Sequence, residues 1–170
     1  MSFDQSMETY ALDPTPEHLK VLQRDIMALP DYDPLVQIAA VTTPLQQAGD
    51  HQGVVDALTS RMPGLFLAPG AHARLFRAYT ELGDQAAADR ERKFALLSMD
   101  AIRSSGTGEE EHPFRVLRVE DQYEVLAALG QHPSSQRTLS DERGDFDVHT
   151  VGEDREVWFE LLWRERDRED

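Results

Sequence analysis

Histidines and carboxylates are the residues of this chain that could do chemistry. The histidines are His18, His51, His72, His112, His132 and His149. No two of them are four residues apart, the spacing that places two metal ligands on one helix face, and the zinc-protease pattern HExxH is absent. We therefore predict structural or surface histidines, with no catalytic residue, no metal site and no cofactor.

Two acidic stretches have the composition of a cation site but not its pattern. Residues 109–111 are three glutamates before His112 in a glycine-containing stretch, which is typical of a solvated loop and lacks the alternating ligands of a calcium loop. Residues 141–147 also contain several acids. Their last two residues, Phe146 and Asp147, belong to a predicted strand whose side chains alternate between faces.

Asp147 and His149 support an enzyme hypothesis, which we keep as an alternative. Asp147 paired with Glu160 would supply two carboxylates on a sheet for acid–base chemistry. A small hydrolase or transferase with a site near Asp147 and His149 would use them. The phosphate-loop patterns GxxxxGK[ST] and GxGxxG and the nucleophile pattern GxSxG are absent. We therefore predict that the protein is not an enzyme.

Composition and charge limit the class of partner. The chain has 170 residues and no cysteine, which excludes disulfides and thiolate sites. Its net charge is −15, of which residues 107–170 carry −10. Such a field repels nucleic acid and anionic membranes and attracts a basic partner. No stretch approaches the about 20 apolar residues of a membrane span, and the first residues lack the features of a signal peptide. We expect a cytoplasmic protein.

Helical periodicity dominates the first 104 residues. We expect a flexible leader over residues 1–15 and a helical domain over residues 16–104. Apolar residues recur at helical spacing in five segments, 16–29, 34–48, 51–62, 71–82 and 85–104. Thr15 is the expected cap of the first helix, and Pro44 is expected to kink the second.

Two Gly-Asp turns divide these helices into hairpins. Glycine accepts the left-handed conformation that ends a helix, and aspartate caps the next helix through its carboxylate. Gly49-Asp50 and Gly83-Asp84 are 34 residues apart, and Leu45 corresponds to Tyr79. We expect Tyr79 to pack in the hairpin core together with Leu82.

This period is that of the tetratricopeptide repeat, which residues 34–104 resemble. The best match is Ala78-Tyr79 with Leu82-Gly83-Asp84, Ala88 and Ala95. The chain departs from the family at Thr42 and Phe76, where a small residue is usual, and at Arg92, where an aromatic is usual. Two units are fewer than such stacks need, so the N-terminal helix and the C-terminal segment are expected to cover the exposed faces.

A small β-containing domain is expected over residues 114–163, after a linker over 105–113 and before a charged, disordered tail over 164–170. Strand-like segments are 114–119, 135–139, 145–151 and 157–161, with a helix over 120–129. The predicted fold class is α+β, with tetratricopeptide-like antiparallel helical hairpins followed by a small β-sheet segment with one helix.

Residues 20–162 also resemble a group of bacterial proteins known only as a domain of unknown function. The resemblance lies in Tyr123-Glu-Val-Leu126 with Leu129-Gly130, in Phe146-Asp147-Val148 and in Val157-Trp158-Phe159. These motifs are structural, so the resemblance implies a fold and no activity.

The tetratricopeptide resemblance implies a groove lined by the first helix of each hairpin. The implied partner-binding residues are Thr43, Gln46, Gln47, Arg77, Thr80 and Glu81. We expect a non-catalytic interaction or scaffold protein that binds a peptide or protein partner through this surface. One alternative is a plain solvated face, or a groove filled by the C-terminal segment. Another is an acidic inhibitor or immunity-type protein that neutralises a basic partner.

Overall fold

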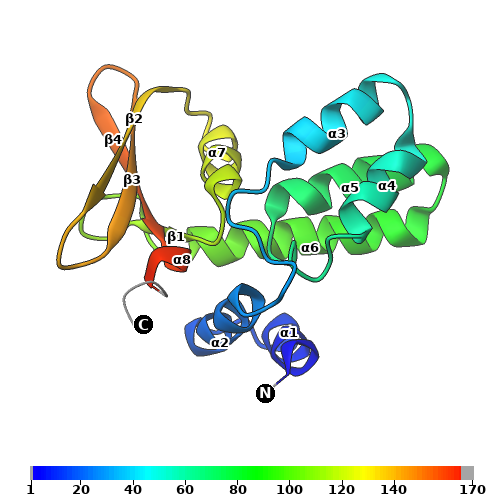
Figure 1. Ribbon diagram of the computed structural model, residues 1–170, viewed down its shortest axis with the longest axis horizontal. Helices are drawn as coiled ribbons and strands as arrows, with labels where there is room; N and C mark the ends of the chain where they lie inside the picture. The colour runs from blue at the N-terminus through cyan, green and yellow to red at the C-terminus, as the bar shows by residue number, and fades with distance from the viewer. Residues whose placement is uncertain (1, 166–170) are drawn as a thin grey trace.

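The computed structural model describes residues 2–165, which form an α+β fold with the helices first and the sheet last, as predicted (Figure 1). The helices are α1 (Phe3–Leu12), α2 (Pro16–Met27), α3 (Ile38–Gln47), α4 (His51–Thr59), α5 (Pro69–Leu82), α6 (Gln85–Arg103), α7 (Val119–Ala128) and α8 (Leu162–Glu165). The strands are β1 (Phe114–Val116), β2 (Pro133–Ser140), β3 (Asp145–Val151) and β4 (Arg155–Leu161). In the described chain no strand precedes Gly106, which confirms the predicted order.

The prediction of a flexible leader over residues 1–15 is wrong, because Phe3–Leu12 form helix α1. Ser2 caps the helix, and its side chain and that of Gln5 form a reciprocal capping box. Tyr10 is buried, and Phe3 and Met7 pack against the same core cluster. These three apolar residues recur at helical spacing, a signal that the polar residues between them obscure.

The Gly-Asp turns form as predicted. Gly49 and Gly83 adopt the left-handed conformation, with φ of 71° and 80°. The Asp50 and Asp84 carboxylates each accept a backbone N–H from the first turn of the helix that follows. The pairs α3–α4 and α5–α6 are therefore successive helical hairpins.

Helix α3 begins at Ile38, four residues later than predicted. Its N-cap Gln37 makes no side-chain cap. The cap comes instead from Glu120 of α7, whose carboxylate oxygens accept the N–H groups of Ile38 and Ala39 at 2.8 and 2.9 Å. Leu35 therefore precedes the helix and is exposed. Pro44 lies inside α3, which continues to Gln47.

The apolar stripe of α5 is narrower than predicted. Leu75 and Ala78 are buried in a cluster shared with α4. Tyr79 is only half-buried against that cluster, and Leu82 is exposed. The second hairpin therefore has a smaller core contact near its turn than the sequence indicates.

The sheet has the order β1-β4-β3-β2, with β1 parallel to β4 and the other pairs antiparallel. One face, here called the inner face, is covered by α7, which lies between the sheet and α3 in Figure 1. Val116, Val125 and Phe159 pack there with Ile102 from the end of α6, so the sheet shares its core with the helical part.

The segments flanking the sheet differ in structure. The predicted linker over 105–113 is a hydrogen-bonded loop, in which the Gly108 carbonyl accepts the Trp158 N–H at 2.9 Å. Of the predicted disordered tail, residues 164 and 165 instead end helix α8. Residues 166–170 lie outside the described residues.

Arg118, with 0% of its surface exposed, joins three segments between the hairpins and the sheet. Its guanidinium donates to the carbonyls of Gly64 and Phe66, and it lies over the Tyr32 ring, 5.7 Å from the centroid. The Asp121 carboxylate is 3.6 Å away. Burial raises the pKa of Asp121 to about 7, and Arg118 opposes this shift.

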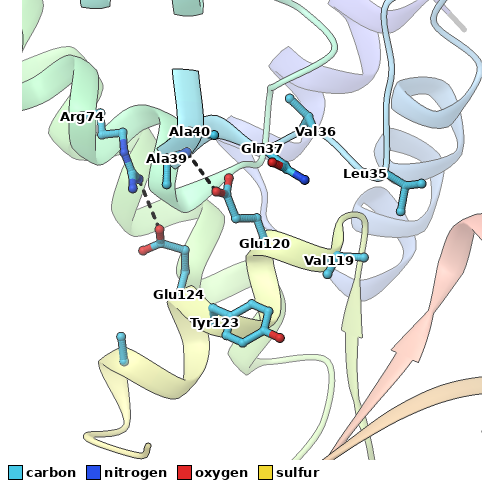
Figure 2. A pocket seen from close by; sticks show the side chains of 11 residues that line it. Leu35, Val36, Gln37, Ala39, Ala40, Arg74, Val119, Glu120, Tyr123 and Glu124 are labelled. Atoms are coloured by element: carbon cyan, nitrogen blue, oxygen red, sulfur yellow. Dashed lines mark hydrogen bonds and ion pairs between the residues drawn. The ribbon is translucent and has the colours of Figure 1, made fainter. Parts of the chain in front are cut away.

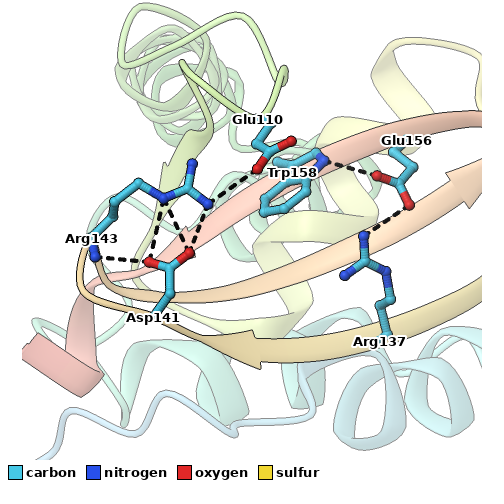
Figure 3. Close-up of polar contacts among 6 residues, drawn as sticks. All are labelled: Glu110, Arg137, Asp141, Arg143, Glu156 and Trp158. Carbon is cyan, nitrogen blue, oxygen red and sulfur yellow. Dashed lines mark hydrogen bonds and ion pairs between the residues drawn. The ribbon is translucent and has the colours of Figure 1, made fainter.

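The outer face of the sheet has an apolar cluster next to two arginines, whose polar contacts Figure 3 shows. Phe146, Val148 and Trp158 are buried there. Arg137 and Arg143 lie over the Trp158 ring, at 5.4 and 5.8 Å from its centroid. Each guanidinium is also paired with carboxylates, Arg137 with Glu156 and Arg143 with Asp141 and Glu110.

The Glu120 cap gives a stability prediction. Glu120→Ala leaves the N–H groups of Ile38 and Ala39 without this acceptor, and we expect a loss of about 1–2 kcal/mol in the free energy of unfolding. Glu120→Gln keeps one oxygen acceptor and should lose less. Glu153→Ala, at an exposed turn, is the control and should change little. Urea denaturation measures all three, and equal stability of Glu120→Ala and Glu153→Ala would contradict the cap.

Candidate functional site

The six predicted partner-binding residues lie on the second halves of α3 and α5. Thr43, Gln47, Arg77, Thr80 and Glu81 are exposed, and Gln46 is half-buried. No hydrogen bond or ion pair joins the α3 set to the α5 set among the described residues. The structure therefore leaves these side chains on the surface without bringing them together through polar contacts.

A concave site lies nearer the N-terminal ends of the same two helices, between α3 and α7 (Figure 2). Its volume is about 750 Å³. The apolar lining residues are Leu35, Val36, Ala39, Ala40, Val119, Tyr123 and Ala127, and the polar ones are Gln37, Arg74, Glu120 and Glu124. We call this the α3–α7 groove. None of the six predicted residues lines it.

Two carboxylates of α7 determine the polar part of the groove. Glu120 and Glu124 are four residues apart and so share one face of the helix. Glu120 caps α3. Glu124 packs against the first turn of α5, where a Cβ added to Gly70 would lie 2.5 Å from its Oε1 atom. Arg74 donates to Glu124 at 3.2 Å and to the Gly70 carbonyl at 3.1 Å, as drawn in part in Figure 2.

The border of the groove carries two exposed apolar side chains. Leu35 is 65% exposed and Tyr123 is 44% exposed. Both lie in segments that were predicted as helices, Leu35 in 34–48 and Tyr123 in 120–129. Leu35 is exposed because Glu120 makes α3 begin after it, and Tyr123 because α7 covers the sheet with the neighbouring Val125 and Leu126. Sequence reasoning missed the groove, since its two walls come from distant parts of the chain.

The alternative site at Asp147 and His149 is a buried polar network on the inner face of the sheet. His149 and Asp147 are 0% and 4% exposed. The Gln122 amide joins them, because its Nε2 donates to Asp147 Oδ2 at 2.8 Å and its Oε1 lies 2.6 Å from His149 Nε2. Thr138 donates to the other Asp147 oxygen at 2.5 Å. This network ties α7 to β3 and β2.

These bonds assign the proton on His149. The Gln122 oxygen can only accept, so His149 Nε2 carries the hydrogen. The other ring nitrogen, Nδ1, is buried and has no hydrogen-bond partner. Burial lowers the pKa of His149, and the nearby Asp147 opposes this only in part. The imidazole is therefore neutral at physiological pH.

The proposed pair of Asp147 with Glu160 is wrong. In the β3–β4 register Phe146 faces Glu160 and Asp147 faces Phe159. Directly opposed residues share a face, so Asp147 points to the inner face and Glu160 to the outer face. Glu160 accepts a hydrogen bond from Arg115 at 2.9 Å. The two carboxylates cannot act on one substrate.

His72 is a second buried histidine, and its pairing with Glu91 was not predicted from the sequence. His72 Nδ1 lies 2.7 Å from Glu91 Oε2, and both residues are buried between α5 and α6. Burial alone would raise the pKa of Glu91, but the hydrogen bond and charge of His72, together with Arg90, lower it. The ring also packs against Phe66 and Phe94, so this pair is part of the core.

Within the described part of the chain, no three histidine or acidic side chains come together in a way that could bind a metal ion. Over residues 2–165 no helix has both the length and the apolar character needed to cross a bilayer. Comparisons of the chain with protein-family models, with curated proteins and with solved structures found no match.

The neutral His149 gives a pH prediction. The unfolded chain takes up a proton near pH 6.5, whereas the native imidazole resists it, so His149 contributes stability that is lost as the pH falls below 6.5. Asp121 acts in the opposite direction over the same range, since its native pKa is raised. The wild type must therefore be compared with a variant that differs only at His149.

We expect His149→Gln, which cannot titrate but can still donate to Gln122, to lose less stability than the wild type between pH 7.5 and pH 5.5. The difference between the two proteins should change by up to about 1.4 kcal/mol, the value of one pKa unit. Urea denaturation at several pH values measures it. Parallel pH profiles would contradict this prediction, because they would show that His149 takes up its proton equally in the native and unfolded states.

Proposed function

We propose that this protein is a non-catalytic interaction protein that binds a peptide segment of a partner in the α3–α7 groove. The observation that carries the proposal is the groove itself, a concavity of about 750 Å³ lined mainly by apolar side chains. This volume is typical of ligand sites. Large apolar side chains that stay exposed beside a concave surface, as Leu35 and Tyr123 do, are typical of interaction sites.

The shape of the groove favours an apolar anchor. Ala39, Ala40 and Ala127 are small, so they leave room between α3 and α7 for an inserted side chain. Tyr123 supplies an aromatic wall, and aromatic residues are enriched where peptides and proteins bind. A large apolar side chain of the partner would bury its surface between these residues.

Charge favours a basic partner. The groove contains two carboxylates, Glu120 and Glu124, and one guanidinium, that of Arg74. The whole chain carries a net charge of −15. A lysine or arginine next to the apolar anchor would be attracted to this surface, mainly through faster association.

The predicted partner-binding residues would extend the groove. Thr43 and Gln47 follow Ala40 at spacings of three and seven residues, and Arg77 and Glu81 follow Arg74 in the same way, so each set shares a helix face with a groove residue. The resemblance to tetratricopeptide hairpins implies the same surface. A longer peptide anchored in the groove would continue along these polar faces.

The test is a selection of displayed random peptides against the full chain. Peptides of about twelve residues are long enough to cross a binding site of standard width. We expect selected peptides to combine a large apolar residue with lysine or arginine. Leu35→Glu should weaken their binding at least tenfold, or about 1.4 kcal/mol. Isothermal titration calorimetry measures the affinities.

The matched control is Leu96→Glu on α6, because Leu96 is an exposed leucine outside the groove. It should leave the affinities unchanged. Thermal denaturation of both variants checks that they fold. The proposal fails when Leu35→Glu and Leu96→Glu bind every selected peptide as the wild type does.

A further inference from the structure

Strand β2 contributes almost nothing to the core, although it is eight residues long. Seven of its side chains are exposed, and Leu139 alone is half-buried. It lies at the edge of the described sheet and pairs with β3 only. Its place in the fold therefore depends on its backbone hydrogen bonds to β3 and on a few side-chain contacts.

The register shows which backbone groups of β2 face away from the sheet. In the turn, Asp141 and Gly144 exchange both N–H to C=O bonds, at 3.0 and 3.3 Å. Hydrogen-bonded and non-hydrogen-bonded pairs alternate along an antiparallel ladder. The N–H and C=O groups of Gln136, Thr138 and Ser140 consequently point away from β3, toward the free edge.

A shelf beside this edge is formed by α7. The Tyr123 ring packs edge-on against His149 at 5.3 Å, and its hydroxyl donates to the Gln136 side chain at 2.8 Å. On the inner face of β2, Gln136 and Thr138 are exposed, so α7 covers β3 and contacts β2 without burying these side chains. If another strand were added beside β2, the side chains on the inner face of that strand would lie next to the Tyr123 ring.

We propose that the free edge of β2 binds an extended peptide segment of another protein as an added strand. The outward backbone groups define the chemistry of the occupant, because a row of alternating donors and acceptors is satisfied by another extended backbone. The charge of the molecule favours a basic peptide over a second copy, because the chain carries −15 and Glu142, in the turn that follows β2, is an exposed acid.

The sequence of β2 suits this role. Pro133 and the register shift between Pro133 and Ser135 limit pairing at the start of the strand. From Ser135 to Ser140 the side chains are polar apart from Leu139, which prevents indiscriminate association with apolar strands. The part of the edge that can pair with another strand is therefore short, and a partner would recognise it mainly through backbone hydrogen bonds.

The experiment distinguishes peptide binding at this edge from peptide binding in the α3–α7 groove. Random displayed peptides of about twelve residues, enough for one added strand, are selected against the full chain carrying Leu35→Glu, the change expected to weaken binding in the groove. Binding of each selected peptide is then measured to the Gln136→Pro and Gln136→Ala variants. Both variants lose the bond to Tyr123, but only proline also removes the outward N–H.

We expect the peptides to bind Gln136→Ala and to bind Gln136→Pro at least tenfold more weakly. In a bound strand, alternate N–H groups face β2 and the others face away from it. N-methylation of the first set should abolish binding to the edge without the proline change, and N-methylation of the second set should not. This measurement remains valid even when the proline variant does not fold. Failure to select any peptide, or equal binding to both variants, would overturn the proposal. So would a concentration-dependent dimer, detected by light scattering, that Gln136→Pro abolishes, because the edge would then bind a second copy.

Discussion

Two carboxylates of α7 support the starts of two other helices. Glu120 accepts the first N–H groups of α3, and Glu124 packs against Gly70 in the first turn of α5. Neither α3 nor α5 has a capping side chain of its own, whereas Asp50 and Asp84 cap α4 and α6. Free N–H groups at a helix start are costly unless water or a side chain binds them, and negative charge is favourable there. The hairpins therefore depend on the C-terminal part of the chain.

The hydrogen bonds of Arg118 hold α7 in one position. It precedes α7 directly and is bonded to the carbonyls of Gly64 and Phe66 in the segment between the two hairpins. A buried guanidinium needs several acceptors at fixed positions, so its site tolerates little displacement. The Val119 N–H also donates to the Pro34 carbonyl at 3.0 Å, next to the start of α3. These bonds fix the distance between α3 and α7, and with it the width of the groove.

The sequence predicts contacts between residues that are close in the chain and misses contacts between residues that are far apart in it. The caps of Asp50 and Asp84 could be predicted because donor and acceptor are three residues apart. The cap of α3 could not, because Glu120 is 82 residues from Ile38. The strand order could not be predicted either, and without the register Asp147 seemed able to pair with Glu160. Each missed feature of the candidate site depends on a contact between the hairpins and the sheet, or between strands.

Tyr123 belongs to both proposed surfaces. Its ring lines the α3–α7 groove, and its hydroxyl donates to Gln136 on the β2 edge. A ligand in the groove that turns this ring would break the hydroxyl bond and change the shelf beside β2. By thermodynamic reciprocity, a strand added to β2 would change the affinity of the groove by the same factor. The His149 network beneath the ring limits this motion, since the imidazole is packed against it and bonded to Gln122. The buried polar network therefore supports the wall that the two proposed surfaces share.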